Sequence, residues 1–153
     1  MNLKNIIKGS FVLGIASISL IACNKDDNDN LPEKVKLLID KDWKIKKASV
    51  IATDNSATSV YKDCMKDDVL KFNTTNYNFS DGTTACDSTI LPYFSSTYSI
   101  NTATDSLFLK AKTTNHIHKM KILKLTADSL IVRWTDDVNS ANKVVKELGF
   151  VNK

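Results

Sequence analysis

The sequence has little of what interrupts regular structure or binds metals. It holds four Gly, two Pro and two His in 153 residues. So few glycines exclude a collagen-like chain and make a glycine-rich phosphate-binding loop implausible. The one long apolar stretch, Phe11 to Ile21, is shorter than the about 20 residues that a membrane-spanning helix needs. With 42% hydrophobic and 25% charged residues, the chain suits one ordinary globular domain.

The chain also lacks a strong excess of positive charge. The formal net charge is +4, but Lys4 and Lys8 lie in an N-terminal segment that contains no acid. Without residues 1–22, 19 basic and 17 acidic residues remain. This near balance argues against nucleic acid as a partner.

The first 23 residues have the layout of a secretory signal, with two lysines followed by an apolar stretch. The stretch ends in Leu20-Ile21-Ala22-Cys23, which resembles the lipobox of bacterial lipoproteins. The resemblance implies cleavage after Ala22 and acylation of Cys23 on its thiol and its new amine. More than one acyl chain gives durable attachment to a lipid bilayer. We therefore expect residues 1–22 to be a lipoprotein signal peptide.

Residues 23–31 are rich in Asp and Asn and cannot bury apolar surface, so they predict a solvated tether. Lys25-Asp26-Asp27, close behind Cys23, resembles the export signal of Bacteroidetes lipoproteins that reach the outer face of the outer membrane. The resemblance implies an outer-membrane protein displayed on the cell surface, with a periplasm-facing anchor as the alternative. The segment lacks the central Gly and distal Glu of a calcium loop.

Residues 32–153 form one predicted domain in which apolar residues recur with period two. From Trp43 onward, Trp43 and Ile45 point to one side of a strand and Lys44 and Lys46 to the other. Further runs of this kind are Val69–Phe72, Tyr77–Phe79, Thr97–Ile100, Leu107–Lys110, Ile117–Lys124 and Leu130–Trp134. Seven or eight short strands without crossover helices predict an all-β antiparallel sandwich or barrel.

A short helix is predicted at each end of this domain. Asn30 can cap the first helix and Pro32 can occupy its first turn. Asn139-Ser140 can cap a C-terminal helix that Gly149 ends. The apolar residues of the two helices are Val35, Leu38 and Ile39 in the first, and Val144, Val145 and Leu148 in the second.

Two cysteines remain once Cys23 is assigned to lipid. Cys64 and Cys86 flank a predicted hairpin in which Leu70 and Phe72 lie opposite Tyr77 and Phe79. An even number of cysteines in an oxidising compartment predicts a disulfide. Closing its loop of about 23 residues contributes roughly 3 kcal/mol of stability in the chain-entropy estimate. A redox or nucleophilic thiol would need a nearby base or a Cys-x-x-Cys spacing, and neither is visible.

Several segments together resemble the lipocalin-like lipoproteins of Bacteroidetes. They are Trp43-Lys44, Asp67 to Phe72 after a Cys, Tyr77-x-Phe79, Asp81-Gly82 before a second Cys, Tyr98-Ser99-Ile100, Asp105-Ser106-Leu107 and Leu125-x-x-Asp128-x-Leu130. The resemblance covers roughly residues 32–134. It implies an up-and-down antiparallel β-barrel of about eight strands, whose interior is filled by side chains or holds one small apolar ligand.

The same resemblance gives two residues a structural role. Trp43 matches the Trp of the Gly-x-Trp motif that opens classical lipocalins, although Lys41 stands where the Gly belongs. Arg133, near the end of the last matched strand, corresponds to the lipocalin arginine that packs over that Trp. The resemblance thus implies packing of Arg133 against Trp43 at the base of the barrel.

Candidate ligand-binding residues are the large side chains expected to line the barrel. They are Trp43, Leu70, Phe72, Tyr77, Phe79 and Tyr98. The alternative is that they only fill the core of a small barrel. The segment Leu91-Pro92-Tyr93-Phe94 falls in a predicted loop, where exposed apolar residues suit a ligand portal or a protein contact.

Catalytic and metal-binding patterns are weak. His116 and His118 face one side of a predicted strand, but no third ligand follows at a useful spacing. The pairs Asp67-Asp68 and Asp136-Asp137 lie at strand boundaries, where acids usually serve turns. No nucleophile elbow occurs. We therefore predict no enzyme activity, no cofactor and no metal.

Two functional hypotheses remain, since fold likeness alone does not choose between them. The first is a lipid-anchored barrel that binds a small hydrophobic ligand. The second is a non-catalytic envelope module that uses the barrel only as a scaffold and contacts a protein or glycan partner through residues such as Tyr93 and Phe94.

Overall fold

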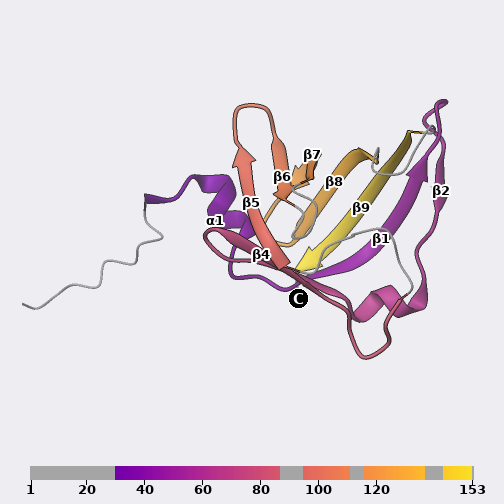
Figure 1. Cartoon of the computed structure of the whole chain (residues 1–153), viewed down its shortest axis with the longest axis horizontal. Helices are drawn as coiled ribbons and strands as arrows, with labels where there is room; N and C mark the ends of the chain where they lie inside the picture. Colours follow the sequence, from indigo (N-terminus) through magenta and orange to yellow (C-terminus); the bar gives the residue numbers. More distant parts are fainter. Residues whose placement is uncertain (1–29, 87–94, 111–115, 137–142, 153) are drawn as a thin grey trace, which may run out of the picture.

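The computed structural model describes residues 30–86, 95–110, 116–136 and 143–152. These ranges hold one short helix, one 3₁₀ segment and nine strands (Figure 1). Their bounds are α1 Glu33–Leu38, β1 Trp43–Ile51, β2 Ala57–Ser59, η2 Asp63–Asp67, β3 Val69–Phe72, β4 Asn76–Ser80, β5 Ser95–Asn101, β6 Ser106–Lys110, β7 Ile117–Leu125, β8 Ser129–Asp136 and β9 Val144–Asn152.

The strands form one antiparallel sheet that closes into a barrel. Neighbours in the sheet follow chain order from β3 to β9, and β9 pairs with β1 to close the ring. The two closing strands lie side by side in Figure 1. The start of β1 pairs with β3 and its end with β2, so β2 is an extra short strand on an eight-stranded ring. The predicted up-and-down barrel is thus confirmed.

The β3–β4 hairpin has the predicted register. Leu70 pairs with Phe79 and Phe72 with Tyr77, and all four side chains are buried. At its tip the side chain of Asn73 accepts hydrogen bonds from two backbone N–H groups, at 3.0 Å and 2.7 Å. This Asx turn explains why a polar run separates the two strands here.

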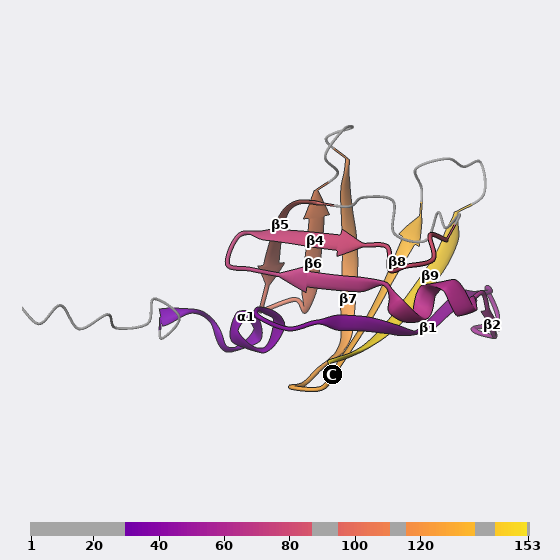
Figure 2. The same cartoon turned by 90° about the horizontal axis from the view of Figure 1, so that it is seen from below.

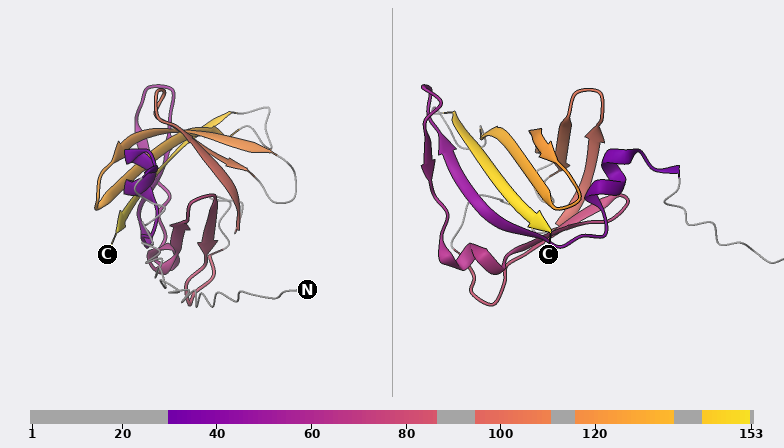
Figure 3. Two further views of the ribbon diagram at one scale, coloured as in Figure 1. Left: turned by 90° about the vertical axis from the view of Figure 1, so that its left-hand side faces the viewer. Right: turned by 180° about the vertical axis from the view of Figure 1, so that it is seen from behind.

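One end of the barrel, which we call the base, is covered by α1. The base is the end where β3–β4, β5–β6 and β7–β8 turn, and α1 lies there (Figures 2 and 3). Leu38 is fully buried, and its carbonyl accepts a 2.8 Å hydrogen bond from Nε1 of Trp43. Lys34 fastens the helix to the β5–β6 turn through the Thr102 carbonyl, at 2.8 Å, and the Asp105 carboxylate.

The disulfide between Cys64 and Cys86 is present, as predicted, with 5.5 Å between the two Cα atoms. It joins η2 to the segment that follows β4. η2 also carries fully buried Met65, which belongs to the barrel core. The bridge therefore fixes a helical turn against one side of the barrel.

The predicted C-terminal helix is wrong. Its apolar residues lie in β9, which pairs along its length with both β8 and β1. Residues 139–140, the predicted cap, lie outside the described residues. A helix here would leave the backbone hydrogen-bonding groups at the edges of β1 and β8 unpaired, whereas a strand forms hydrogen bonds with both edges. Gly149 lies in this strand, where an added Cβ would come within 3.2 Å of the Lys47 Cβ.

The N-terminal helix is confirmed with a different start. Its N-cap residue is Pro32 rather than Asn30, and no side chain caps it. Val35, Leu38 and Ile39 face the core, as predicted. The helix starts later because its position is set by packing against the base rather than by a cap.

Candidate functional site

The predicted barrel-lining residues lie in the barrel interior. Five of them are buried and Tyr98 is partly buried against the same core. They share this core with fully buried residues from the other strands, including Leu107, Met120, Leu130, Leu148 and Phe150. Their position inside the barrel satisfies the core alternative, and contact with a ligand stays a prediction.

The aromatic side chains of β3, β4 and β5 are fixed by contacts to their neighbours. The rings of Phe72 and Tyr98 meet edge to face, with 5.0 Å between centroids. The Tyr98 hydroxyl donates to the Asn73 carbonyl at 2.7 Å, and the Tyr77 hydroxyl donates to the Lys110 carbonyl at 3.2 Å. Burial, with the charge of Asp40, raises the pKa of Tyr98 to about 12, so this hydroxyl remains a donor at neutral pH.

Polar side chains point inward at the other end of the barrel, which we call the mouth. The mouth is where β4, β6 and β8 end and β5, β7 and β9 begin. Strand alternation places Asp136 on the inner face with buried Trp134, and Lys146 on the inner face with buried Leu148. Oδ2 of Asp136 and Nζ of Lys146 are 2.5 Å apart, and both side chains are at least three-quarters buried.

The two histidines also belong to the mouth. Their ring centroids are 4.5 Å apart, and His118 is buried opposite Leu109 on the inner face. Among the residues that the structure describes, no three metal-ligating side chains gather at one place. The pair is therefore an inward-facing polar group at the start of β7.

The acids of the first predicted pair hold a turn. Asp67 accepts hydrogen bonds from the N–H and the hydroxyl of Thr83, at 2.8 Å and 2.7 Å, which lower its pKa. Asp68 is buried and accepts from the N–H of Gly82 at 3.1 Å, but burial raises its pKa. Both act in the turn beside the disulfide. Of the second pair, Asp136 lies in the mouth and Asp137 is outside the described residues.

The structure corrects the packing implied for Arg133. Its Nη2 and Nε bind Oε2 of Glu147 at 2.6 Å and 3.0 Å. Arg133 pairs with Glu147, whereas Trp43 pairs with Asn152, five residues farther along β9, or roughly 16 Å. The cation over the Trp43 ring is Lys41, whose Nζ lies 5.5 Å from the ring centroid.

Glu147 is a nearly buried carboxylate between two cations. Besides Arg133, it binds Nζ of Lys47 at 2.8 Å. Burial by itself would raise the pKa of Glu147, but the hydrogen bonds and charges of Lys47 and Arg133 outweigh it and lower the pKa. Because the folded pKa is lowered, this carboxylate stabilises the fold above its ordinary pKa of 4.5, and the contribution is lost as the pH falls below that value.

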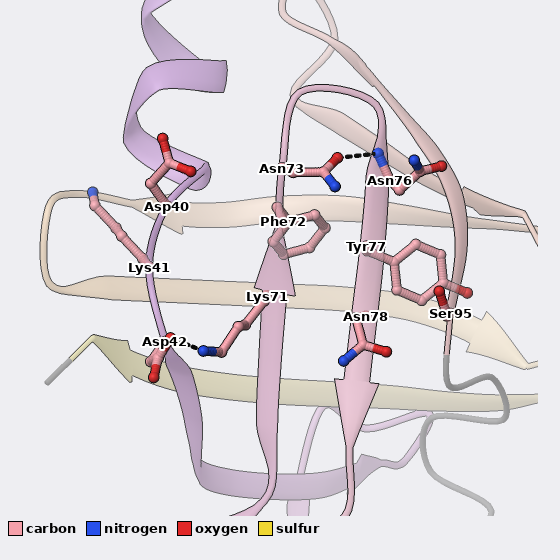
Figure 4. Close-up of a pocket in the computed structure, with 10 residues that line it drawn as sticks. All are labelled: Asp40, Lys41, Asp42, Lys71, Phe72, Asn73, Asn76, Tyr77, Asn78 and Ser95. Atoms are coloured by element: carbon pink, nitrogen blue, oxygen red, sulfur yellow. Dashed lines mark hydrogen bonds and ion pairs between the residues drawn. The ribbon is translucent and has the colours of Figure 1, made fainter.

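A polar groove that the sequence did not indicate lies outside the barrel, over β3 and β4 (Figure 4). It has a volume of about 610 Å³. The ion pair between Lys71 and Asp42, at 2.8 Å, crosses it, and Asn78 and Ser95 line its far side. The only feature of the sequence that indicated this groove was the set of outward-facing polar residues that alternate with the core residues of the strands. Such residues occur on any solvated strand surface as well.

Some predicted residues cannot be placed. Cys23, the signal peptide and most of the tether lie outside the described residues, as do Tyr93 and Phe94. Among the helices of the described ranges, none is long and apolar enough to cross a membrane.

The comparison with known families agrees with this geometry. Residues 39–132, more than half of the chain, match the lipocalin-like domain. Domains of this kind are generally non-catalytic binding proteins. No curated protein matches the chain significantly. The match begins at the end of α1 and extends into β8, so it spans most of the ring described above. The chain therefore belongs to the lipocalin-like domain family.

Proposed function

We propose that this barrel binds one small, mainly apolar ligand through its mouth. The observation that carries the proposal is the contrast between the two ends. At the base, α1 and Trp43 form a closed apolar cover. At the mouth, a charged pair and a histidine project into the interior. Among the described residues, the mouth is the end with inward-facing polar groups that can orient the head of an entering ligand.

The mouth ion pair is costly for a purely structural core. Moving two charges out of water commonly costs more free energy than their mutual attraction recovers. Two apolar residues at the same positions would often make the fold equally or more stable. Asp136 and Lys146 nevertheless sit on the inner face beside Trp134. Such a pair next to an apolar wall is the arrangement that fixes the orientation of a ligand with one polar end.

A matched pair of tryptophan substitutions tests this site. Ser96 is on the inner face opposite Tyr77, and Ser95 is its outward-facing neighbour opposite Asn78. In the full chain in detergent micelles, we expect dodecanoate to displace the bound uncharged probe N-phenyl-1-naphthylamine. Ser96→Trp fills the mouth and should weaken binding at least about tenfold, whereas Ser95→Trp should change it less than about twofold.

The circular dichroism spectrum of each variant checks that the barrel is retained. Equal affinities for wild type and Ser96→Trp would contradict a site inside the barrel. Loss of binding in Ser95→Trp alone would move the site to the outer groove of Figure 4 and favour the second function, an envelope module that contacts a protein or glycan partner.

We further propose that acylated Cys23 holds the barrel on the outer membrane, displayed at the cell surface. The support is the signal layout and the Leu20-Ile21-Ala22-Cys23 sequence. The tether joins the domain next to α1, at the base, and leaves the mouth at the opposite end.

Palmitate labelling in a Gram-negative host tests the anchor. Cys23→Ser should abolish labelling, because the acceptor thiol is gone. The double variant Cys64→Ser, Cys86→Ser serves as control and should be labelled like wild type. Labelling that persists in Cys23→Ser would refute the anchor. Protease treatment of intact cells then separates surface display, where the barrel is cleaved, from a periplasm-facing anchor, where it is protected.

A further inference from the structure

A second concave surface lies on the outer wall of the barrel, across β6 to β9. It has a volume of about 470 Å³. We call it the basic groove; its lining residues include Thr104, Ser106, Lys119, Lys121, Arg133 and Thr135. Trp134 and Val145 complete its lining. The three cations face away from the mouth, because they alternate along β7 and β8 with the buried residues Met120 and Val132, which face the interior.

The cations of this groove repel one another. Lys121 and Arg133 are directly paired across β7 and β8, and Lys119 lies two residues along β7 on the same face. Like charges directly opposite each other destabilise a sheet, and an acid opposite a base would be the stable choice. Arg133 has such an acid, Glu147, opposite it on β9, whereas Lys121 has Ser106 opposite it on β6 and Lys119 has Phe108.

Acids near the groove neutralise it only in part. Glu147 is shared between Lys47 and Arg133, so one carboxylate faces two cations. Asp105 in the adjacent turn is bound by Lys34 of α1, and the charge of Lys121 also helps to lower its pKa. Among the described residues, Lys119 and Lys121 have no carboxylate within ion-pair distance. Lys121 donates to the Thr104 carbonyl at 3.0 Å, and Lys119 lies 6.0 Å from the Phe108 ring centroid.

We propose that the basic groove binds the phosphate or sulfate ester of a sugar. Arg and Lys side chains are strong partners for such oxyanions. The exposed hydroxyls of Thr104 and Thr135 flank the cations and can hydrogen-bond with sugar hydroxyls. The groove volume lies within the range of small-molecule sites, about 300–1,000 Å³. The proposal does not depend on a ligand in the mouth.

Calorimetric titration of the full chain in detergent micelles tests the proposal with glucose 6-phosphate, glucose 6-sulfate, glucose and inorganic phosphate. We expect both esters to bind and glucose not to bind. The double variant Lys119→Gln, Lys121→Gln should lose at least about tenfold in affinity. Lys62→Gln, Lys66→Gln is the matched control, because it removes the same charge from exposed positions on and beside η2. It should change the affinity less than about twofold.

Three outcomes would overturn the proposal: no binding of either ester, equal losses in the two double variants, or binding of inorganic phosphate as tight as that of the sugar esters. A phosphorylated glycolipid in the same micelles distinguishes the sources of the sugar. Tighter binding than the soluble ester assigns the groove to a lipid headgroup, and equal or weaker binding assigns it to a free sugar ester. Displacement of the uncharged N-phenyl-1-naphthylamine probe is followed in parallel, so failure at the groove is distinguished from failure at the mouth.

Discussion

Replacing Trp43 by alanine is expected to lower the free energy of unfolding by about 4 kcal/mol. The side chain is fully buried at the base, so its loss leaves a cavity, and such truncations cost about 3–5 kcal/mol. The same change removes the N–H that binds the Leu38 carbonyl, which leaves a buried acceptor without that partner. Because α1 covers the base through this contact, we expect the helix to loosen as well.

Urea denaturation followed by the fluorescence of Trp134, the other tryptophan, measures the effect. Trp43→Phe keeps most of the apolar volume and removes the N–H, so an intermediate loss of about 1–2 kcal/mol is expected. Ile117→Ala is the surface control. Its side chain is 55% exposed, and the change should stay within about 0.5 kcal/mol. A loss below about 1.5 kcal/mol for Trp43→Ala would show that the base is not held by this residue.

Removal of the disulfide is the second large effect. The double variant Cys64→Ser, Cys86→Ser should lose about 3 kcal/mol, because the open chain gains the freedom that a closed loop with a sequence separation of 22 residues denies it. The bridge also holds η2, whose Met65 is buried in the core, so we expect the loss to include looser packing there.

Wild type in a thiol reductant provides the internal comparison. Its unfolding midpoint should fall to that of the double variant, and the reductant should leave the variant unchanged. Coincident urea midpoints for oxidised wild type and the variant would mean that the bridge adds no stability to this barrel.

The two proposed sites use the two faces of the same strands. Alternation along β7 and β8 sends Met120 and Val132 into the interior and Lys121 and Arg133 to the outer wall. A ligand in the mouth and a sugar ester in the basic groove would therefore be separated by one layer of sheet. Each proposed site is tested with its own pair of variants, so the experiments can reject one proposal without rejecting the other.

Much of the barrel followed from the sequence because its signals are local. The period-two runs predicted β3 to β8 within one or two residues of their observed bounds. The polar run between Phe72 and Tyr77 predicted the hairpin register. The positions of Cys64 and Cys86 around that hairpin predicted the bridge. Each of these signals depends on neighbours in the chain and on side chains alternating between core and solvent.

The tertiary structure decided what depends on distant strands. Val144 to Phe150 suits a helix or a strand in isolation, and the open edges of β1 and β8 made it a strand. Arg133 binds Glu147 because the two residues are directly opposite each other on β8 and β9. The cation over the Trp43 ring is Lys41 instead. The mouth ion pair depends on the pairing of β8 with β9, and the basic groove depends on the side-by-side arrangement of β6 to β9. Sequence alone determined strands β3 to β8 and the bridge, and the pairing of strands determined which side chains meet.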